Sequence, residues 1–170
     1  MLKQSSFELS TLLSALVDTF EPIRKTKGLQ LSVKIDTSLP NRILSDLKRL
    51  RQILVSLIGN AVKHTSRGSV DIKLAPLQSM PLAVSADTDA DSGINGRFDL
   101  EFTVSDTGSG IASDRMEHIF EPFGPGFGAD SPALGNHYPG AGSTGLGLSI
   151  CKRLVEHMGD RISAADSSGR

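Results

Sequence analysis

The sequence contains a single cysteine, Cys151, which excludes an intrachain disulfide and a cysteine-rich metal site. We expect this cysteine to be a small core residue on a helix. The chain has no apolar run long enough to span a membrane, and residues 1–13 lack the layout of a signal peptide. These absences favour a reducing, cytoplasmic setting and predict that this chain makes no membrane contact.

An excess of charge is also lacking, since 18 basic and 19 acidic side chains give a formal net charge of −1. Such a balance provides no general attraction to nucleic acid or anionic lipid, so we predict that the protein binds no nucleic acid. Any anion that it binds must therefore be held by local geometry.

What the chain does contain is enough apolar sequence for one compact domain over residues 1–170. Apolar residues at helical spacing predict helices over residues 9–27, 46–65, 113–120 and 144–158. Alternating apolar residues predict strands over residues 29–35, 70–74 and 98–104, a short extended piece at 42–44 and the beginning of a strand at 161–165.

Three residues are expected to punctuate these helices. Asp46 suits the N-cap of the helix over residues 46–65, and Gly28 suits the end of the helix before it. Pro22 is expected to kink that first helix or to end it early.

Two segments lack periodicity and are predicted to be loops, residues 76–97 and residues 121–143. The first contains Asp87, Asp89 and Asp91, which have the spacing that begins a calcium-binding loop. Glycine falls one place late and no glutamate closes the loop, so we interpret these residues as solvated acids.

The helix over residues 46–65 carries a polar stripe, because Ser56, Asn60 and Lys63 are spaced to share one face. An amide oxygen is a hard ligand suited to magnesium, and an ammonium suits a terminal phosphate. The stripe therefore fits a metal-bound polyphosphate, although by itself an ordinary solvated face explains it better.

A turn with the sequence DTGSGI, residues 106–111, follows a predicted strand. The carboxylate of Asp106 can accept a hydrogen bond from an exocyclic amine such as that of adenine. Gly108 and Gly110 let the backbone turn sharply and approach a flat ring. The alternative interpretation is a tight turn after an edge strand.

Two further segments complete the set. In residues 119–123, IFEPF, the aromatic rings could form the wall of a nucleotide pocket, although two phenylalanines beside a proline are more often core. Residues 140–148, GAGSTGLGL, lead into a helix whose exposed amides and partial positive charge suit a phosphate. A flexible linker is the alternative, and neither the Walker pattern nor a βαβ unit is present.

In this order, the segments resemble the conserved boxes of the GHKL superfamily, and specifically the catalytic ATP-binding domain of sensor histidine kinases. Residues 46–65, DLKRLRQILVSLIGNAVKHT, resemble its N box, and residues 106–111 its first glycine box. Residues 119–123 resemble its F box, and residues 142–148, GSTGLGL, its second glycine box. The resemblance covers nearly the whole chain.

The resemblance implies a fold, an α+β two-layer sandwich of the Bergerat type. A mixed, mostly antiparallel sheet would pack on three helices, and ATP would lie between the helix layer and a lid formed by residues 124–141. Neither the final strand of the fold nor the phospho-acceptor domain is expected within this chain. None of His64, His118, His137 and His157 has the His-Glu-x-x-Thr-Pro context of family acceptors.

It also implies residue roles. Asn60 would hold magnesium, Lys63 would contact the terminal phosphate, and these two are the predicted catalytic residues. Asp106 would read the adenine amine. The other predicted nucleotide-binding residues are His64, Gly108, Gly110, Ile111, Ile119, Phe120, Phe123, Thr144, Gly145, Leu146, Gly147 and Leu148.

The chain departs from the family pattern at three places. Ser56 stands where the N box usually has its first asparagine, and His64 where an aromatic ring usually lies over adenine. Between residues 124 and 151 there is no lysine or arginine, which leaves only His137 to neutralise a terminal phosphate. Because a lost charge-assisted contact costs about 1.5–3 kcal/mol, we expect weaker ATP binding than in relatives.

As to function, the resemblance implies Mg-ATP binding and transfer of the γ-phosphate to a histidine on a separate dimerisation and phospho-acceptor domain of the parent protein. A response regulator would act downstream. Whether the parent protein is anchored in a membrane stays open. One alternative is a catalytically weak or inactive nucleotide-binding regulatory module. Another is an ATPase like the heat-shock chaperones, gyrase or mismatch-repair proteins, which needs a glutamate base where Ser56 stands.

Overall fold

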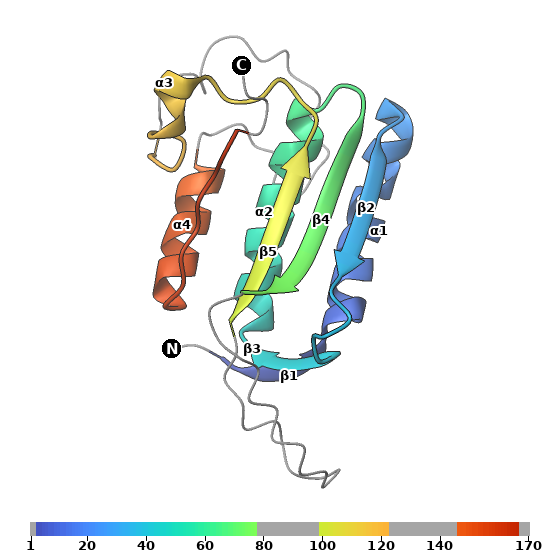
Figure 1. The fold of residues 1–170 in the computed structure, drawn as a ribbon, viewed down its shortest axis with the longest axis vertical. Coiled ribbons are helices and arrows are strands. Elements are labelled where there is room, and N and C mark those ends of the chain that lie inside the picture. The colour runs from blue at the N-terminus through green and yellow to red at the C-terminus, as the bar shows by residue number, and fades with distance from the viewer. Residues whose placement is uncertain (1–2, 78–98, 123–145, 167–170) are drawn as a thin grey trace, which may run out of the picture.

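The computed structural model describes residues 3–77, 99–122 and 146–166. Its helices are α1 (Leu9–Lys27), α2 (Leu47–His64), α3 (Ser113–Met116) and α4 (Gly147–His157). Its strands are β1 (Ser5–Glu8), β2 (Gln30–Ile35), β3 (Arg42–Ser45), β4 (Ser69–Pro76) and β5 (Leu100–Asp106). Figure 1 shows a sheet of β2, β4 and β5 in front of α1 and α2, with α4 beside α2. The predicted two-layer α/β sandwich is confirmed.

The larger sheet has the strand order β2-β4-β5 and is mixed. β2 runs parallel to β4, and β4 runs antiparallel to β5 with Val70 opposite Asp106. β1 and β3 form a separate antiparallel pair. Figure 1 shows this pair near the start of α2, at the end of the helix layer away from the end of β5. Because β4 begins shortly after α2 ends, this register places the end of β5 beside the C-terminal end of α2.

The core lies between the sheet and the helices. α1 and α2 bury the apolar faces that their periodicity predicts, and β4 buries alternate residues against them. Burial of each such aliphatic side chain stabilises the fold by about 1.5–3 kcal/mol. The residues of this layer with 2% exposure or less include Leu9, Leu13, Leu16, Leu54, Ile58, Val62, Val70, Ile72 and Leu74.

A smaller cluster joins α4 to α2. It consists of Ile53, Cys151 and Val155, with Leu57 and Leu154 packed beside them. Cys151 is 1% exposed, and its thiol lies 3.8 Å from the carbonyl oxygen of Ile53. The predicted role of Cys151 as a small core residue on a helix is confirmed.

The helix termini follow from local chemistry. Asp46 caps α2, since one carboxylate oxygen accepts the Arg49 amide at 3.1 Å and the other accepts the Lys3 amide at 3.0 Å. These two backbone donors, Arg49 first, hold the pKa of Asp46 below its usual value. Gly28 ends α1 in the left-handed region with φ 66°, and the Leu29 amide donates to Arg24 O at 3.0 Å.

Four local predictions need correction. α1 continues through Pro22 to Lys27, so that proline does not end the helix early. α3 ends at Met116. After it, the His118 amide donates to Arg115 O and the Glu121 amide to His118 O, and such bonds between residues three apart form turns in place of α-helix. Residues 161–165 form no strand and have no strand partner in the described part of the chain. Pro76 belongs to β4, so the loop predicted at 76–97 starts later, and residues 78–98 lie outside the described ones.

One element was not predicted at all. β1 is only four residues long, and it forms because Ser5 to Glu8 pair with β3. So short a segment carries no clear alternation of its own.

Among the helices that the structure describes, none combines the length and apolarity needed to cross a bilayer.

Candidate functional site

The candidate site lies where α2 ends and β5 ends. Asp106 is the last residue of β5, and its Oδ1 accepts the Gly108 amide at 2.8 Å. The same oxygen lies 3.4 Å from the hydroxyl of Thr65, which follows α2 and is fully buried. No residue in the described ranges hydrogen-bonds the other oxygen, Oδ2. The carboxylate is therefore fixed on one side and open to a ligand on the other.

Thr65 holds this corner together. It ends the segment that resembles the N box, but the sequence predicted no role for it. Its amide donates to Ala61 O at 3.1 Å and its hydroxyl to the same oxygen at 2.7 Å. That geometry closes the last turn of α2 and sets the hydroxyl beside Asp106. The sequence signal was weak, because a threonine after a helix is common and its partner is 41 residues away.

Gly108 packs against the end of α2 so tightly that no side chain fits there. A Cβ at this position would lie 2.5 Å from the carbonyl oxygen of His64 and 2.7 Å from Asp106 Oδ1. Both contacts are shorter than real Cβ atoms make. Glycine is thus required at position 108 because the turn approaches α2 so closely. This reason is separate from the predicted one, which was room for a flat ring. Gly110, also predicted, has φ 71°.

The start of α4 lies over the polar stripe of α2. A Cβ on Gly147 would meet Ser56 Oγ at 3.1 Å and Asn60 Nδ2 at 3.9 Å. Ser56 is therefore a contact residue between the two helices, and Asn60 lies beside the first turn of α4. Two segments that are 87 residues apart, Asn60 and Gly147, are brought together.

The first turn of α4 offers backbone donors. Its first helical hydrogen bond runs from the Ile150 amide to Leu146 O at 2.9 Å, and no side-chain cap precedes it. The amides of Gly147 and Leu148 thus lack helical acceptors, as at any helix start. Such an end suits an anion. Phe123, Thr144 and Gly145, also predicted as site residues, lie outside the described residues.

A groove of about 2100 Å³ runs along α2 and β5. This volume exceeds that of a typical ligand pocket. It does so because the groove continues past the site to β3 and to the segment after α4. The predicted site residues that line it are Asn60, Lys63, His64, Asp106, Gly108, Gly110, Ile111, Ile119, Phe120 and Leu148. Leu146 and Gly147 lie next to it, at the start of α4.

Cationic groups surround the end of α2. Partial removal from water lowers the pKa of the His64 imidazole, and the nearby Lys63 and Lys27 ammonium groups lower it further, while Asp106 opposes them. The lowered pKa favours the neutral imidazole at neutral pH. The residue as a whole is exposed. Lys63 is half-buried and lines the groove.

The F-box segment forms part of the groove wall. Ile119 is 7% exposed and Phe120 is half-buried, and both line the groove. The His118 imidazole lies 3.1 Å from the Glu121 carboxylate, which raises the pKa of His118. The pair spans the turn after α3.

The described residues contain no cluster of three or more His, Cys, Asp or Glu side chains that could hold a metal. Asn60, with one amide oxygen, is the predicted ligand. A site with a single neutral ligand suits a magnesium ion that is also bound to phosphates. It suits a metal held by protein alone less well.

The sandwich, and a groove bounded by the end of α2 and the start of α4, define a class of protein, the ATP-binding domains of histidine kinases and their relatives. The chain belongs to the family of histidine kinase-, DNA gyrase B- and HSP90-like ATPases, whose sequence signature matches residues 45–170. The resemblance stated from the sequence is thereby confirmed.

Two curated relatives cover nearly all of this chain. The hybrid signal transduction protein dokA of Dictyostelium discoideum is 34% identical over 172 residues, which are 99% of this chain and 9% of dokA. The signal transduction histidine-protein kinase BarA of Escherichia coli K12 is 32% identical over 163 residues, 96% of this chain and 16% of BarA. The chain thus spans a small part of the length of these relatives.

A solved structure is similar as well. The crystal structure of full-length ShkA in complex with AMPPNP superposes with a TM-score of 0.68 at 31% identity, covering 94% of this chain and 27% of ShkA.

Proposed function

We propose that this chain binds Mg-ATP at the end of the groove bounded by Asn60, Asp106 and the start of α4. It would transfer the γ-phosphate, in the cytoplasm, to a histidine on a separate dimerisation and phospho-acceptor domain of the same parent protein. The observation that carries the proposal is the place of the start of α4 over α2, where a Cβ on Gly147 would lie 3.9 Å from the amide nitrogen of Asn60. A response regulator would receive the phosphoryl group afterwards.

The adenine would be recognised at Asp106. Its Oδ1 is already occupied by the Gly108 amide, so Oδ2 would accept from the exocyclic amine. The ring of His64, whose neutral form is favoured, lies at the same end of α2 and offers a flat surface for stacking, with less area than a larger aromatic ring.

The phosphates would lie between α2 and α4. Amides in the first turn of α4, at Gly147 and Leu148, would donate to phosphate oxygens, and Lys63 would meet the terminal phosphate. Asn60 would hold magnesium through its amide oxygen, and the bound ion would neutralise charge on the phosphates. AMPPNP, an ATP analogue, is bound in the ShkA structure, which supports a nucleotide here.

The chemistry asks little of this chain beyond placement. An imidazole nitrogen of the acceptor forms a bond to the γ-phosphorus while the bond to the bridging oxygen breaks, and ADP leaves with the electron pair. The chain's own residues hold the triphosphate in line and balance its charge. No base is needed on this domain, because the acceptor domain can provide one.

The test is transfer of phosphate from labelled ATP to the purified dimerisation domain of the parent protein. We expect transfer only when both domains are present, and a loss of about tenfold or more for Asp106→Asn because the amide presents a donor to the adenine amine. The matched control is Asp18→Asn, on the exposed face of α1, which should transfer as the wild type does. Wild-type protein that binds ATP but never transfers phosphate would contradict kinase activity.

A second candidate is a nucleotide-binding regulatory module. It is favoured by the absence of lysine and arginine between residues 124 and 151, which removes a charge that would bind the terminal phosphate. Equal affinity for ADP and ATP without magnesium dependence would support this candidate. A hydrolytic ATPase has less support, because Ser56 faces Gly147 and supplies no carboxylate base.

A further inference from the structure

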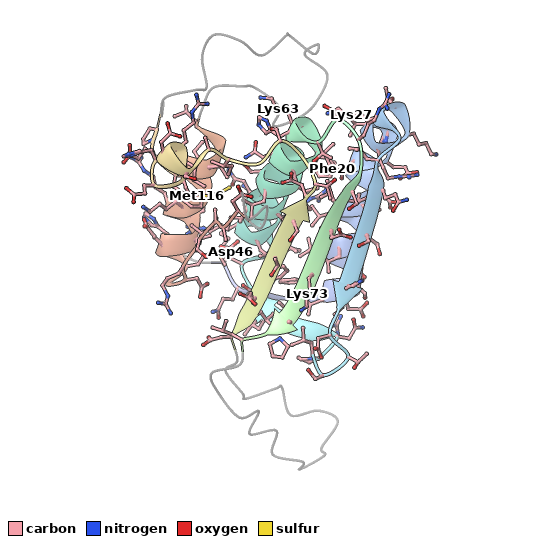
Figure 2. All side chains as sticks on the ribbon, turned by 45° about the horizontal axis from the view of Figure 1, so that its top comes forward. Phe20, Lys27, Asp46, Lys63, Lys73 and Met116 are labelled. Carbon is pink, nitrogen blue, oxygen red and sulfur yellow. The ribbon has the colours of Figure 1, made fainter. Side chains whose placement is uncertain are left out.

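Lys27, the last residue of α1, makes three hydrogen bonds to the end of α2. Its ammonium donates to the carbonyl oxygens of Val62 at 2.8 Å, Lys63 at 3.0 Å and Thr65 at 3.2 Å. These carbonyls belong to the helix end, where no intrahelical donor remains for them. An ammonium has three protons, so all of its donors are used. Figure 2 shows Lys27 and Lys63 at the same end of the helix layer, far from Asp46.

Two of the three residues that Lys27 binds, Lys63 and Thr65, belong to the candidate site. Lys63 and His64 line the groove, and the Thr65 hydroxyl lies beside Asp106. The carbonyl of His64, which lies between those that Lys27 binds, faces Gly108. Lys27 and the glycine turn therefore both contact the last turn of α2.

The positive charge of Lys27 lies at the C-terminal end of α2. The C-terminal end of a helix carries partial negative charge, and a cation there is stabilising. Burial lowers the pKa of the Lys27 ammonium, and no carboxylate within the described ranges pairs with it. Partial burial of an ammonium costs free energy, and here carbonyl dipoles alone offset that cost.

We propose that Lys27 is a positioning residue for nucleotide binding. It touches neither nucleotide nor metal, and acts by fixing the last turn of α2 so that Lys63, His64 and Asp106 keep their places. This inference rests on the proposed function, because it concerns the same pocket. The alternative is that Lys27 stabilises the fold but does not influence the pocket.

The experiment compares Lys27→Met, Lys27→Gln and Lys27→Arg. Methionine keeps the apolar stem without donors, glutamine keeps two neutral donors, and arginine keeps charge and donors. The matched control is Lys25→Met, since Lys25 lies in the same last turn of α1 with its side chain 70% exposed. Affinity for Mg-AMPPNP is measured by calorimetry well below the Tm of each variant. Backbone amide exchange is measured by NMR.

We expect Lys27→Met to weaken Mg-AMPPNP binding by roughly tenfold, Lys27→Gln by less, and Lys27→Arg to restore most of the affinity. Faster exchange should be confined to Thr65, Gly108 and the last turn of α2. If the methionine variant does not fold, the glutamine variant provides the comparison. Lys25→Met should match the wild type in both measurements.

The proposal is overturned if folded Lys27→Met or Lys27→Gln binds within twofold of the wild type, or if exchange rises evenly through α1 and α2. Either result would make Lys27 a residue of general stability. Failure of the proposed function has a different signature, since the wild type would then bind no adenine nucleotide. Local exchange at Thr65 and Gly108 would still decide whether Lys27 positions this end of α2.

Discussion

At the scale of single residues, the close contact of Gly108 with backbone at the end of α2 limits which side chain the turn can carry. Gly108→Ala would place a methyl group 2.5 Å from the backbone oxygen of His64 and 2.7 Å from Asp106 Oδ1, so the turn, the helix end or Asp106 must shift. We expect a loss of stability of about 1–3 kcal/mol and a fall in nucleotide affinity. Urea unfolding and calorimetry measure the two effects.

Gly59→Ala is the control for this substitution. Gly59 is also on α2, but a Cβ there would meet only the Phe20 ring at an ordinary 3.7 Å. We expect unchanged nucleotide affinity and equal or higher stability, because alanine favours helix more than glycine does. Similar affinity for Gly108→Ala and the wild type would show that the turn does not position the site.

The candidate site residues differ in how clearly the sequence indicates them. Asn60, Asp106 and Gly147 stand in short motifs whose chemistry is readable from residue type and spacing. Lys27 stands in no such motif, and Thr65 ends the N-box segment without a predicted role. Their contacts with Val62 and Asp106 span 35 or more residues and depend on how α1, α2 and β5 meet. A lysine in a last helical turn is usually explained by solvation alone, so nothing in the sequence distinguished it.

At the scale of elements too, the sequence predicts what depends on local pattern and misses what depends on distant partners. α1, α2, β2, β4 and β5 have apolar periodicity over a long enough stretch to be predicted. β1 is created by its pairing with β3, and α3 stops after one turn although its pattern continues. The segment 161–165 has the alternation of a strand but no partner among the described residues, and alternation without pairing does not make a strand.

The capping of α2 by Asp46 leads to a prediction about acid. The pKa of Asp46 is lower in the folded chain than its usual 3.8, because the Arg49 and Lys3 amides donate to the carboxylate. The unfolded chain thus binds the proton more tightly, so this contribution to stability is present above pH 3.8 and is lost as the pH falls through the lower folded value. Asp46→Asn should be less stable than the wild type at pH 7, and the gap should narrow in acid.

Urea midpoints at a series of pH values measure this gap. Asp18→Asn serves as the reference for removing a carboxylate from an exposed helical position without a cap. A difference between Asp46→Asn and the wild type that stays constant from pH 7 to strong acid would show that the charge of Asp46 contributes nothing to capping.

At the scale of the whole molecule, charge decides how a triphosphate can be held. The chain has a net charge of −1, and residues 124–151 contribute no lysine or arginine. The described residues contain no acidic cluster that could retain a metal without nucleotide. Magnesium should therefore arrive with ATP and supply much of the charge balance, with Asn60 as its protein ligand. This predicts that ATP binding depends on magnesium, and that the dependence itself depends on Asn60.

The measurement is a cycle of ATP affinities, with and without magnesium, for the wild type and Asn60→Ala. We expect chelation to weaken binding to the wild type by roughly tenfold or more, and to weaken binding to Asn60→Ala much less, because the protein–metal contact is already gone. Gln52→Ala removes an exposed amide eight residues before Asn60 on α2, and it should behave as the wild type does. Equal magnesium dependence in the wild type and Asn60→Ala would mean that the ion contacts the phosphates alone. No magnesium dependence in the wild type would instead favour the regulatory module over the kinase.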